Sequence, residues 1–188
     1  KVEFWIELKK DWGITNSQDF NPVIRNKVYL SQARQEFINK VNSQIEVIQK
    51  GYYLDEVFGN SGPIPPEVGK TTTYTIIWQA KNYYNDVKNT RVKANLGKGV
   101  SLTGKIFPEG TRLTFDSQSR EVVWELENLD AGKGILGAGP NVTFQIAFTP
   151  VASQKGQTAA LIGKATISGE DQFTGLTISS EAPAISTT

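Results

Sequence analysis

The sequence contains no cysteine, histidine or methionine. Without histidine and cysteine, the usual zinc, copper and iron sites lose their main ligands. Neither a Ser-His-Asp nor a Cys-His catalytic set can be assembled, and no disulfide can form. We therefore predict no metal site, no cofactor and no catalytic residues, and expect that the chain is not an enzyme. Because methionine is absent, Lys1 is not a translation start, so we expect a processed product or a fragment of a longer protein.

Long apolar runs and a charge imbalance are also missing. No apolar run approaches the roughly 18 residues that a membrane-spanning helix needs. Twenty Lys and Arg residues face nineteen Asp and Glu residues, and the two signs are spread along the chain. No basic stripe indicates a nucleic-acid surface. The 188 residues suggest one domain, or one and a part, at roughly 100 to 200 residues per domain.

Alternating apolar and polar residues are abundant after residue 62. Pro63, Pro65 and Pro66 impose an extended entry, and residues 74–80 then alternate as a half-buried strand. Further strand-like segments recur about every 8 to 12 residues with turn signals between them, which favours an all-β sandwich. They cover residues 91–96, 113–115, 122–126, 142–148, 161–167 and 176–178. Trp78 and Trp124 have apolar neighbours two residues away, so we predict both in the core.

The first 50 residues are less regular. Residues 2–8 and 23–30 alternate as strands. Residues 32–50 fit a helical stripe through Ala33, Phe37 and Val41 but also alternate as strands, and periodicity alone leaves both open. An internal repeat favours strands. Residues 2–10 resemble residues 142–150 and residues 24–31 resemble residues 162–170, so residues 32–50 correspond to the predicted hairpin at residues 169–184. A short helical turn at residues 33–36 remains an alternative.

Several short motifs resemble one family of repeat modules. The motifs are Pro-Glu-Val-Gly at residues 66–69, Tyr-Thr-Ile at residues 74–76, and a W-x-L-x-x-L-x-x-G pattern at residues 124–132. They resemble modules of large bacterial and archaeal surface proteins, the DUF11-like and CARDB-like group, including proteins of candidate-phylum bacteria. The resemblance covers residues 63 to about 180 and implies an immunoglobulin-like β-sandwich. It further implies a structural module of an extracellular, repeat-built cell-surface protein such as a surface layer, stalk, adhesin or filament.

The repeat and the resemblance together predict the domain organisation. Residues 1–50 are expected to be the C-terminal strands of a preceding immunoglobulin-like repeat, and residues 51–62 a linker. Residues 63–180 are expected to form a complete sandwich, followed by a linker or tail at residues 181–188. The apolar face of the first part includes Phe4, Ile6, Val28 and Ile45, and a few strands with such a face are unstable alone. We expect strands of the same polypeptide, or a neighbouring molecule through strand addition, to cover it.

Four residues are candidate sites for partners. Tyr83 and Tyr84 lie together in a predicted turn, where exposed rings could stack on a sugar or contact a protein. This makes a carbohydrate-binding or adhesive module the alternative function. Phe4 and Ile6 are a candidate surface for neighbouring repeats or copies of the protein. Asn141 begins an Asn-Val-Thr sequon, a candidate for glycosylation.

Two further patterns are judged structural. Residues 132–138 match the Gly-x-Gly-x-x-Gly dinucleotide fingerprint, but an alternating strand follows where the mechanism needs a helix N-terminus. We therefore predict a loop that binds no nucleotide. Acidic residues in predicted turns lack the spacing of a calcium loop and are interpreted as solvated turn residues. They are Asp116, Glu127, Asp130, Glu170 and Asp171.

Overall fold

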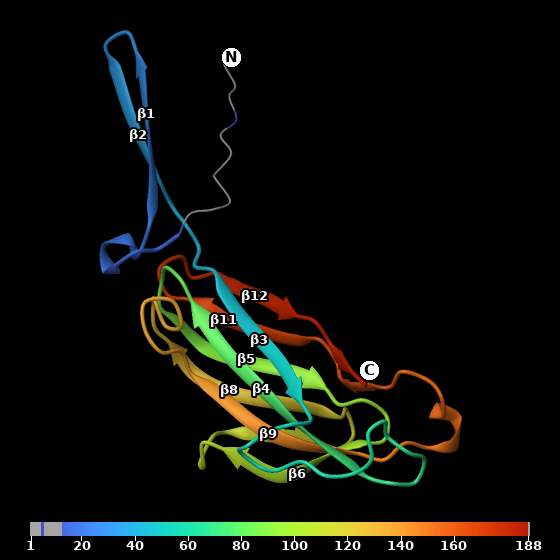
Figure 1. Ribbon diagram of the computed structural model, residues 1–188. Coiled ribbons are helices and arrows are strands. Elements are labelled where there is room, and N and C mark those ends of the chain that lie inside the picture. Colours follow the sequence, from blue (N-terminus) through green and yellow to red (C-terminus); the bar gives the residue numbers. More distant parts are fainter. Residues whose placement is uncertain (1–4, 6–12, 188) are drawn as a thin grey trace.

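The computed structural model describes residue 5 and residues 13–187, and Figure 1 shows their arrangement. In these residues the regular structure is strand, apart from two short 3-10 turns, η1 (Ser17–Asp19) and η2 (Ala152–Gln154). The strands are β1 (Val23–Leu30), β2 (Ala33–Lys40), β3 (Ile45–Tyr52), β4 (Thr72–Asn82), β5 (Val87–Asn95), β6 (Val100–Phe107), β7 (Leu113–Asp116), β8 (Glu121–Leu129), β9 (Asn141–Phe148), β10 (Ala160–Ile162), β11 (Ala165–Asp171), β12 (Thr177–Ala182) and β13 (Ile185–Ser186).

Two antiparallel sheets form the body of the molecule. One has four strands in the order β3-β4-β9-β6, and the other has five in the order β12-β11-β5-β8-β7. In an immunoglobulin-like sandwich, the strands of one sheet follow the order A-B-E-D and those of the other the order G-F-C. Here β3-β4-β9-β6 corresponds to the first order, and β12-β11-β5 corresponds to the second. Strands β8 and β7 extend the second sheet beyond β5. The predicted all-β sandwich is confirmed.

The core lies between the inner faces of the two sheets. Along β4, the side chains of Tyr74, Ile76, Trp78 and Ala80 alternate into it as predicted, and Trp78 is fully buried. The Trp78 ring packs edge to face on Phe144 at 5.0 Å between centroids, a favourable arrangement of aromatic quadrupoles. Its indole N–H donates to Gln49 Oε1 at 2.7 Å, so the polar atom is satisfied inside the core. Trp124 is 4% exposed, and the predicted burial of both indoles is confirmed.

The predicted boundary between residues 50 and 63 is wrong. Strand β3 pairs along its length with β4, and Ile45 and Val47 are buried in the sandwich core. Residues 51–62 are therefore no linker between repeats. Within them, Asp55 accepts a hydrogen bond from Thr75 of β4, and Asn60 accepts one from Gln145 of β9. This loop covers buried polar side chains on the four-stranded sheet, which would otherwise lack partners.

The C-terminal boundary also needs correction. Strand β12 continues to Ala182, which is buried, and β13 pairs with β10. Thr187 N donates to Ala159 O at 2.9 Å. Residues 181–187 thus belong to the sandwich and are not a tail.

Two strand assignments differ from the prediction. Strand β6 was not predicted, because its register against β9 shifts between Leu102 and Ile106 and interrupts the alternation that reveals a strand. The segment predicted as one strand at residues 161–167 is divided into β10 and β11, which lie in different sheets. Residues 32–50 contain the strands β2 and β3, as the internal repeat favoured, and no helix.

Strands β1 and β2 form a hairpin that projects from one end of the sandwich (Figure 1). A two-residue turn, Ser31 and Gln32, joins them, and Ser31 has φ of 52°. Among the described residues these two strands pair only with each other. Of the predicted apolar face, Phe4 and Ile6 lie outside the described residues, Val28 is on the exposed hairpin, and Ile45 is in the sandwich core. The expected incomplete repeat that includes Ile45 is therefore not what the chain forms.

Candidate interaction site

The two faces of the projecting hairpin differ in charge. Residues directly opposite each other in an antiparallel pair point to the same side, and successive residues alternate. One face, here the charged face, carries Arg25, Lys27, Tyr29, Arg34, Glu36, Ile38 and Lys40 with Val23. The other, here the uncharged face, carries Ile24, Asn26, Val28, Ala33, Gln35, Phe37 and Asn39. The hairpin thus offers one face suited to burial against a partner and one suited to water.

Large apolar side chains of the hairpin are open to solvent. On the uncharged face, Val28 is 40% exposed and Phe37 is 47% exposed. On the charged face, the guanidinium of Arg34 lies over the Tyr29 ring at 5.7 Å, and Arg25 pairs with Glu36 at 3.6 Å. Tyr29 and Ile38 of the charged face are more exposed still, at 64% and 54%, but they lie among charged side chains. The exposed apolar groups of the uncharged face have only uncharged neighbours on that face, so a partner could cover them without burying a charge.

Four buried polar residues fix the base of the hairpin, and we call them the clamp: Ser43, Asn82, Asn85 and Asp171. Ser43 N donates to Asp171 Oδ2 at 2.6 Å, and Ser43 Oγ donates to Asn82 Oδ1 at 2.6 Å. Asn85 Nδ2 donates both to Asp171 Oδ2 at 2.7 Å and to Val41 O at 2.8 Å. The clamp therefore ties residues 41–43, which follow β2, to both sheets of the sandwich.

The Asp171 carboxylate is the charged centre of the clamp. Burial alone would raise its pKa, but hydrogen bonds from Ser43 N, the Asn85 side chain and the backbone amides of Thr174 and Phe173 outweigh burial. The pKa lies below its ordinary value, so the carboxylate is ionised at neutral pH. An ionised acceptor with several donors makes stronger hydrogen bonds than a neutral one.

Further contacts hold both strands of the hairpin to the sandwich. Asn21 N donates to Tyr84 O at 3.1 Å, just before β1 begins. At the end of β2, Lys40 Nζ donates to Phe173 O at 2.7 Å and lies over the Phe173 ring at 4.6 Å. Val41 N donates to Pro22 O at 3.0 Å, so the two ends of the hairpin are adjacent.

The predicted aromatic pair does not form an open platform. Tyr84 is 6% exposed, and Tyr83 is half-buried with its hydroxyl 3.3 Å from Glu46 Oε2. The two rings are tilted by 45° with centroids 5.8 Å apart. Burial raises the pKa of both phenols. The open aromatic surface that the alternative, carbohydrate-binding function needs is therefore not formed by these two residues, because they pack at the base of the hairpin.

The other predicted sites lie apart from the clamp. Asn141 is exposed at the first residue of β9, where its side chain is accessible, and its glycosylation stays a prediction. Residues 132–138 form a tight loop between β8 and β9, strands of different sheets. Gly134 has φ of 79°, and a Cβ there would lie 3.1 Å from Ala80 O, so glycine is needed for close packing on β4. A strand and not a helix follows this loop, as predicted.

The acidic turn residues divide into two kinds. Asp116 accepts hydrogen bonds from Gln118 N and Ser119 Oγ in an exposed turn, as interpreted from the sequence. Glu127 and Glu170 lie in strands β8 and β11 and not in turns as predicted, and they pair at the surface with Arg112 and Lys88. Asp171 is different: it is fully buried, and its interpretation as a solvated turn residue is wrong. Among the described residues no group of three or more acidic side chains could hold a metal ion.

A register signal could have identified the clamp. Asn82 continues the inner-face series of Trp78 and Ala80, and Asp171 continues that of Ala165 and Ile167. A polar side chain at an inner position must find buried partners. The sequence thus indicates that these two residues are buried, although not which partners they meet.

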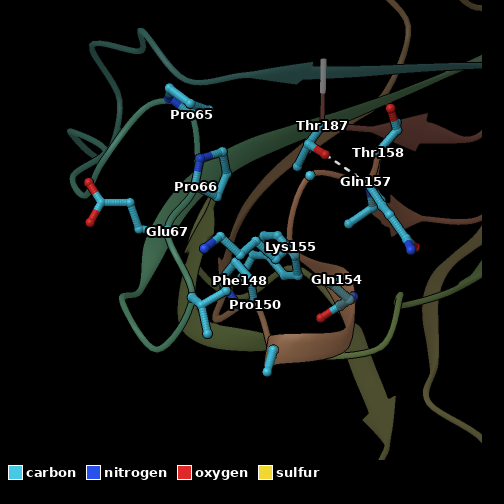
Figure 2. A pocket seen from close by; sticks show the side chains of 14 residues that line it. Pro65, Pro66, Glu67, Phe148, Pro150, Gln154, Lys155, Gln157, Thr158 and Thr187 are labelled. Carbon is cyan, nitrogen blue, oxygen red and sulfur yellow. Dashed lines mark hydrogen bonds between the residues drawn. The ribbon is translucent and has the colours of Figure 1, made fainter.

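A groove of about 780 Å³ lies at the end of the sandwich opposite the hairpin, and we call it the end groove. Figure 2 shows Pro66 and Glu67 on one side, Thr187 and Gln157 on the other, and Phe148 and Pro150 between them. Gly69 N donates to Pro150 O at 2.9 Å, which ties the proline segment to the end of β9. Residues that line the groove are Pro65, Pro66, Glu67, Val68, Phe148, Pro150, Ala152, Gln154, Lys155, Gly156, Gln157, Thr158, Ala159 and Thr187.

No protein-family model matches this sequence, and no curated protein matches it. Several solved structures are similar in fold. The major pilin subunit BcpA of Bacillus cereus is 11% identical, with 85% of this chain and 50% of that chain covered and a TM-score of 0.48. The full-length major pilin SpaD from Corynebacterium diphtheriae is 12% identical, with 76% and 35% covered and a TM-score of 0.45. The RrgA Jo.In complex is 9% identical, with 76% and 92% covered and a TM-score of 0.41.

This chain spans half or less of the two pilin chains. At these identities and TM-scores, the similarity does not show the family or the function of this chain. Both have to be argued from its own residues. In the part of the chain that the structure describes, no helix has the length and hydropathy to cross a membrane.

Proposed function

We propose that this chain is a structural module of an extracellular, repeat-built cell-surface protein of the DUF11-like and CARDB-like kind that its motifs resemble. Its role is to space neighbouring modules and to contact them, and surface layers, stalks, adhesins and filaments are the assemblies that such a role serves. Neighbouring repeats or copies of the same protein are the partners. The observation that carries the proposal is the projecting β1–β2 hairpin, whose base is fixed by a buried polar network.

A fixed hairpin suits a contact role for a physical reason. A two-stranded sheet without a covered face is marginal in water, so its apolar side chains gain stability when a partner covers them. The clamp restricts how the hairpin departs from the sandwich. A restricted element loses less conformational freedom on binding than a flexible one, which favours a defined contact between modules.

The alternative function, carbohydrate binding through Tyr83 and Tyr84, is not favoured by any specific observation. Tyr84 is buried, and the Tyr83 hydroxyl contacts Glu46. A sugar platform needs open aromatic faces, and these two rings do not provide one.

Removal of the hairpin tests the proposal. Because Pro22 and Val41 are joined by a backbone hydrogen bond, residues 23–40 can be replaced by Asn-Gly, which closes a two-residue hairpin turn. Light scattering over a range of concentrations should show association of the full chain and its loss in this variant. A control variant carries Glu109→Asn, which creates the same Asn-Gly pair in the β6–β7 turn and leaves the hairpin intact. Equal association of the full chain and the hairpin-less variant would contradict the proposed role.

A further inference from the structure

The edges of the sandwich are poorly suited to accept an added strand. Strand β7 has four residues, and β6 has a register shift between Leu102 and Ile106. Strands β3 and β12 lie beside each other along one side of the body (Figure 1). Short, irregular or covered edges are the features by which proteins prevent strand addition. A module contact made by this sandwich therefore has to use side chains and grooves.

Charge also opposes strand addition at the edges of the hairpin. Arg25, Lys27, Arg34 and Lys40 lie on the charged face, with Glu36 as the one carboxylate there. Two hairpins paired edge to edge would bring these cations together, and like charges at close range are repulsive. The uncharged face carries no such penalty, and its Val28 and Phe37 are partly exposed.

The end groove offers what the uncharged face needs. Its walls include Pro65, Pro66 and Pro150, which lack backbone N–H groups, so burial of this surface leaves few donors unpaired. Val68, 43% exposed, adds apolar surface. Of the groove's two charged residues, Glu67 pairs with Lys70 at 2.6 Å, and Lys155 is exposed. The charged face of a hairpin would bring further cations towards Lys155, whereas the uncharged face would not.

The two features lie at opposite ends of one molecule (Figure 1). Eight residues per strand extend the hairpin by about 27 Å at about 3.4 Å per residue, which takes its tip well clear of its own sandwich. A contact between unlike ends of identical chains is head to tail, and such a contact propagates as a fibre when it does not close into a ring.

We propose that the uncharged face of the hairpin of one copy docks in the end groove of a second copy. Val28 and Phe37 lie against the proline-lined walls, and the charged face stays in water. This inference rests on the proposed function, because it names the surface through which one module contacts the next. The occupant of the groove is a second copy of this chain and not a free peptide.

The absence of cysteine allows a clean crosslinking test in the full chain. One batch carries Gln35→Cys on the uncharged face, a second carries Val68→Cys at the groove, and a tag distinguishes their masses. A short bismaleimide should join residues 35 and 68 in the mixture. The matched control is Glu36→Cys, the adjacent exposed residue on the charged face. We expect at least about a tenfold higher yield from position 35 than from position 36, since docking raises the effective concentration of one thiol at the other.

A charge on the docking face should weaken the contact. Phe37→Asp is expected to raise the dissociation constant for self-association at least about tenfold, because a buried carboxylate would lack a partner. Tyr29→Asp, on the charged face, is the control and should change it little. Circular dichroism checks that both variants keep the fold.

Other outcomes separate this inference from the proposed function. Crosslinks between two copies of Gln35→Cys, without crosslinks from 35 to 68, would mean that hairpins pack face to face. That result would overturn the groove as the docking site but leave a contact role for the hairpin. Equal yields from positions 35 and 36 would also overturn the inference. A chain that stays monomeric at all concentrations, with Phe37→Asp indistinguishable from the unmodified chain, would overturn both.

Discussion

The β1–β2 hairpin and the β3–β4 pair are built alike in the backbone but not in their surroundings. Each joins eight residue pairs in continuous antiparallel register. In β3 and β4, alternate side chains are buried in the core, whereas no residue of β2 is buried. Backbone hydrogen bonds replace bonds to water, so each contributes only about 1 kcal/mol net, and this contribution is similar in the two pairs. Packing between the sheets is therefore what distinguishes the β3–β4 pair, and within the described chain the hairpin has only the contacts at its base.

The largest expected effect compares a buried aromatic with an exposed one. Trp78→Ala removes a fully buried indole, its contact with Phe144 and its hydrogen bond to Gln49, and should cost about 3 to 5 kcal/mol. Phe37→Ala, on the hairpin, should change the free energy of unfolding of the monomer by no more than about 0.5 kcal/mol. Urea unfolding of both variants in dilute solution measures the difference. A large loss from Phe37→Ala would mean that the hairpin is covered within the monomer.

The second prediction concerns the clamp, which joins the two regions. Asp171→Ala leaves four donors without their acceptor: Ser43 N, the Asn85 amide, Phe173 N and Thr174 N. The expected cost is about 2 to 4 kcal/mol, since buried donors would lose hydrogen bonds to a charged group. Residues 41–44 should also become much more sensitive to protease. Asp116→Ala, in an exposed turn, is the control and should change the free energy of unfolding far less than Asp171→Ala.

The sandwich could be predicted because its buried side chains recur at every second residue, which is the period of a strand. Tyr74, Ile76, Trp78 and Ala80 alternate without interruption, so β4 and its core face were evident. β6 was missed where a register shift breaks the period, and β3 was assigned to another domain. Alternation shows that a segment is a strand, but it does not show which sheet the strand joins. That depends on non-local pairing, which a single sequence does not display.

The interaction site was less predictable than the fold. The hairpin strands were expected, but their projection from the sandwich depends on what the rest of the chain leaves uncovered. Ser43 and Asp171 are 128 positions apart in sequence, and only the folded chain brings them to 2.6 Å. Tyr84 was placed in a turn, and turns are usually exposed, but the segment before β1 packs beside it.

Acidification should loosen the hairpin base before it unfolds the sandwich core. The pKa of Asp171 is lower in the folded chain than the ordinary value of about 3.9. Its stabilising contribution is therefore present above about pH 4 and is lost as pH falls through the folded-state pKa. Proteolysis or hydrogen exchange at residues 41–44 should increase over this range, more than exchange in β4. In Asp171→Asn this part of the pH dependence should disappear; if it persists unchanged, another group holds the base.

The smallest expected effect concerns the hairpin alone. Ser31 adopts φ of 52°, a left-handed conformation that costs an ordinary residue roughly 1 to 2 kcal/mol and glycine almost nothing. Ser31→Gly should therefore strengthen the turn, although glycine loses more freedom on folding, and the net gain should be about 0.5 kcal/mol. Because the hairpin lacks a covered face, this gain should not alter the unfolding of the sandwich. It should instead slow amide exchange in β1 and β2, and Gln32→Gly, at a position without positive φ, should speed it. If Ser31→Gly raised the unfolding midpoint of the whole chain, hairpin and sandwich would unfold as one unit, and the division between a packed region and a dependent one would fail.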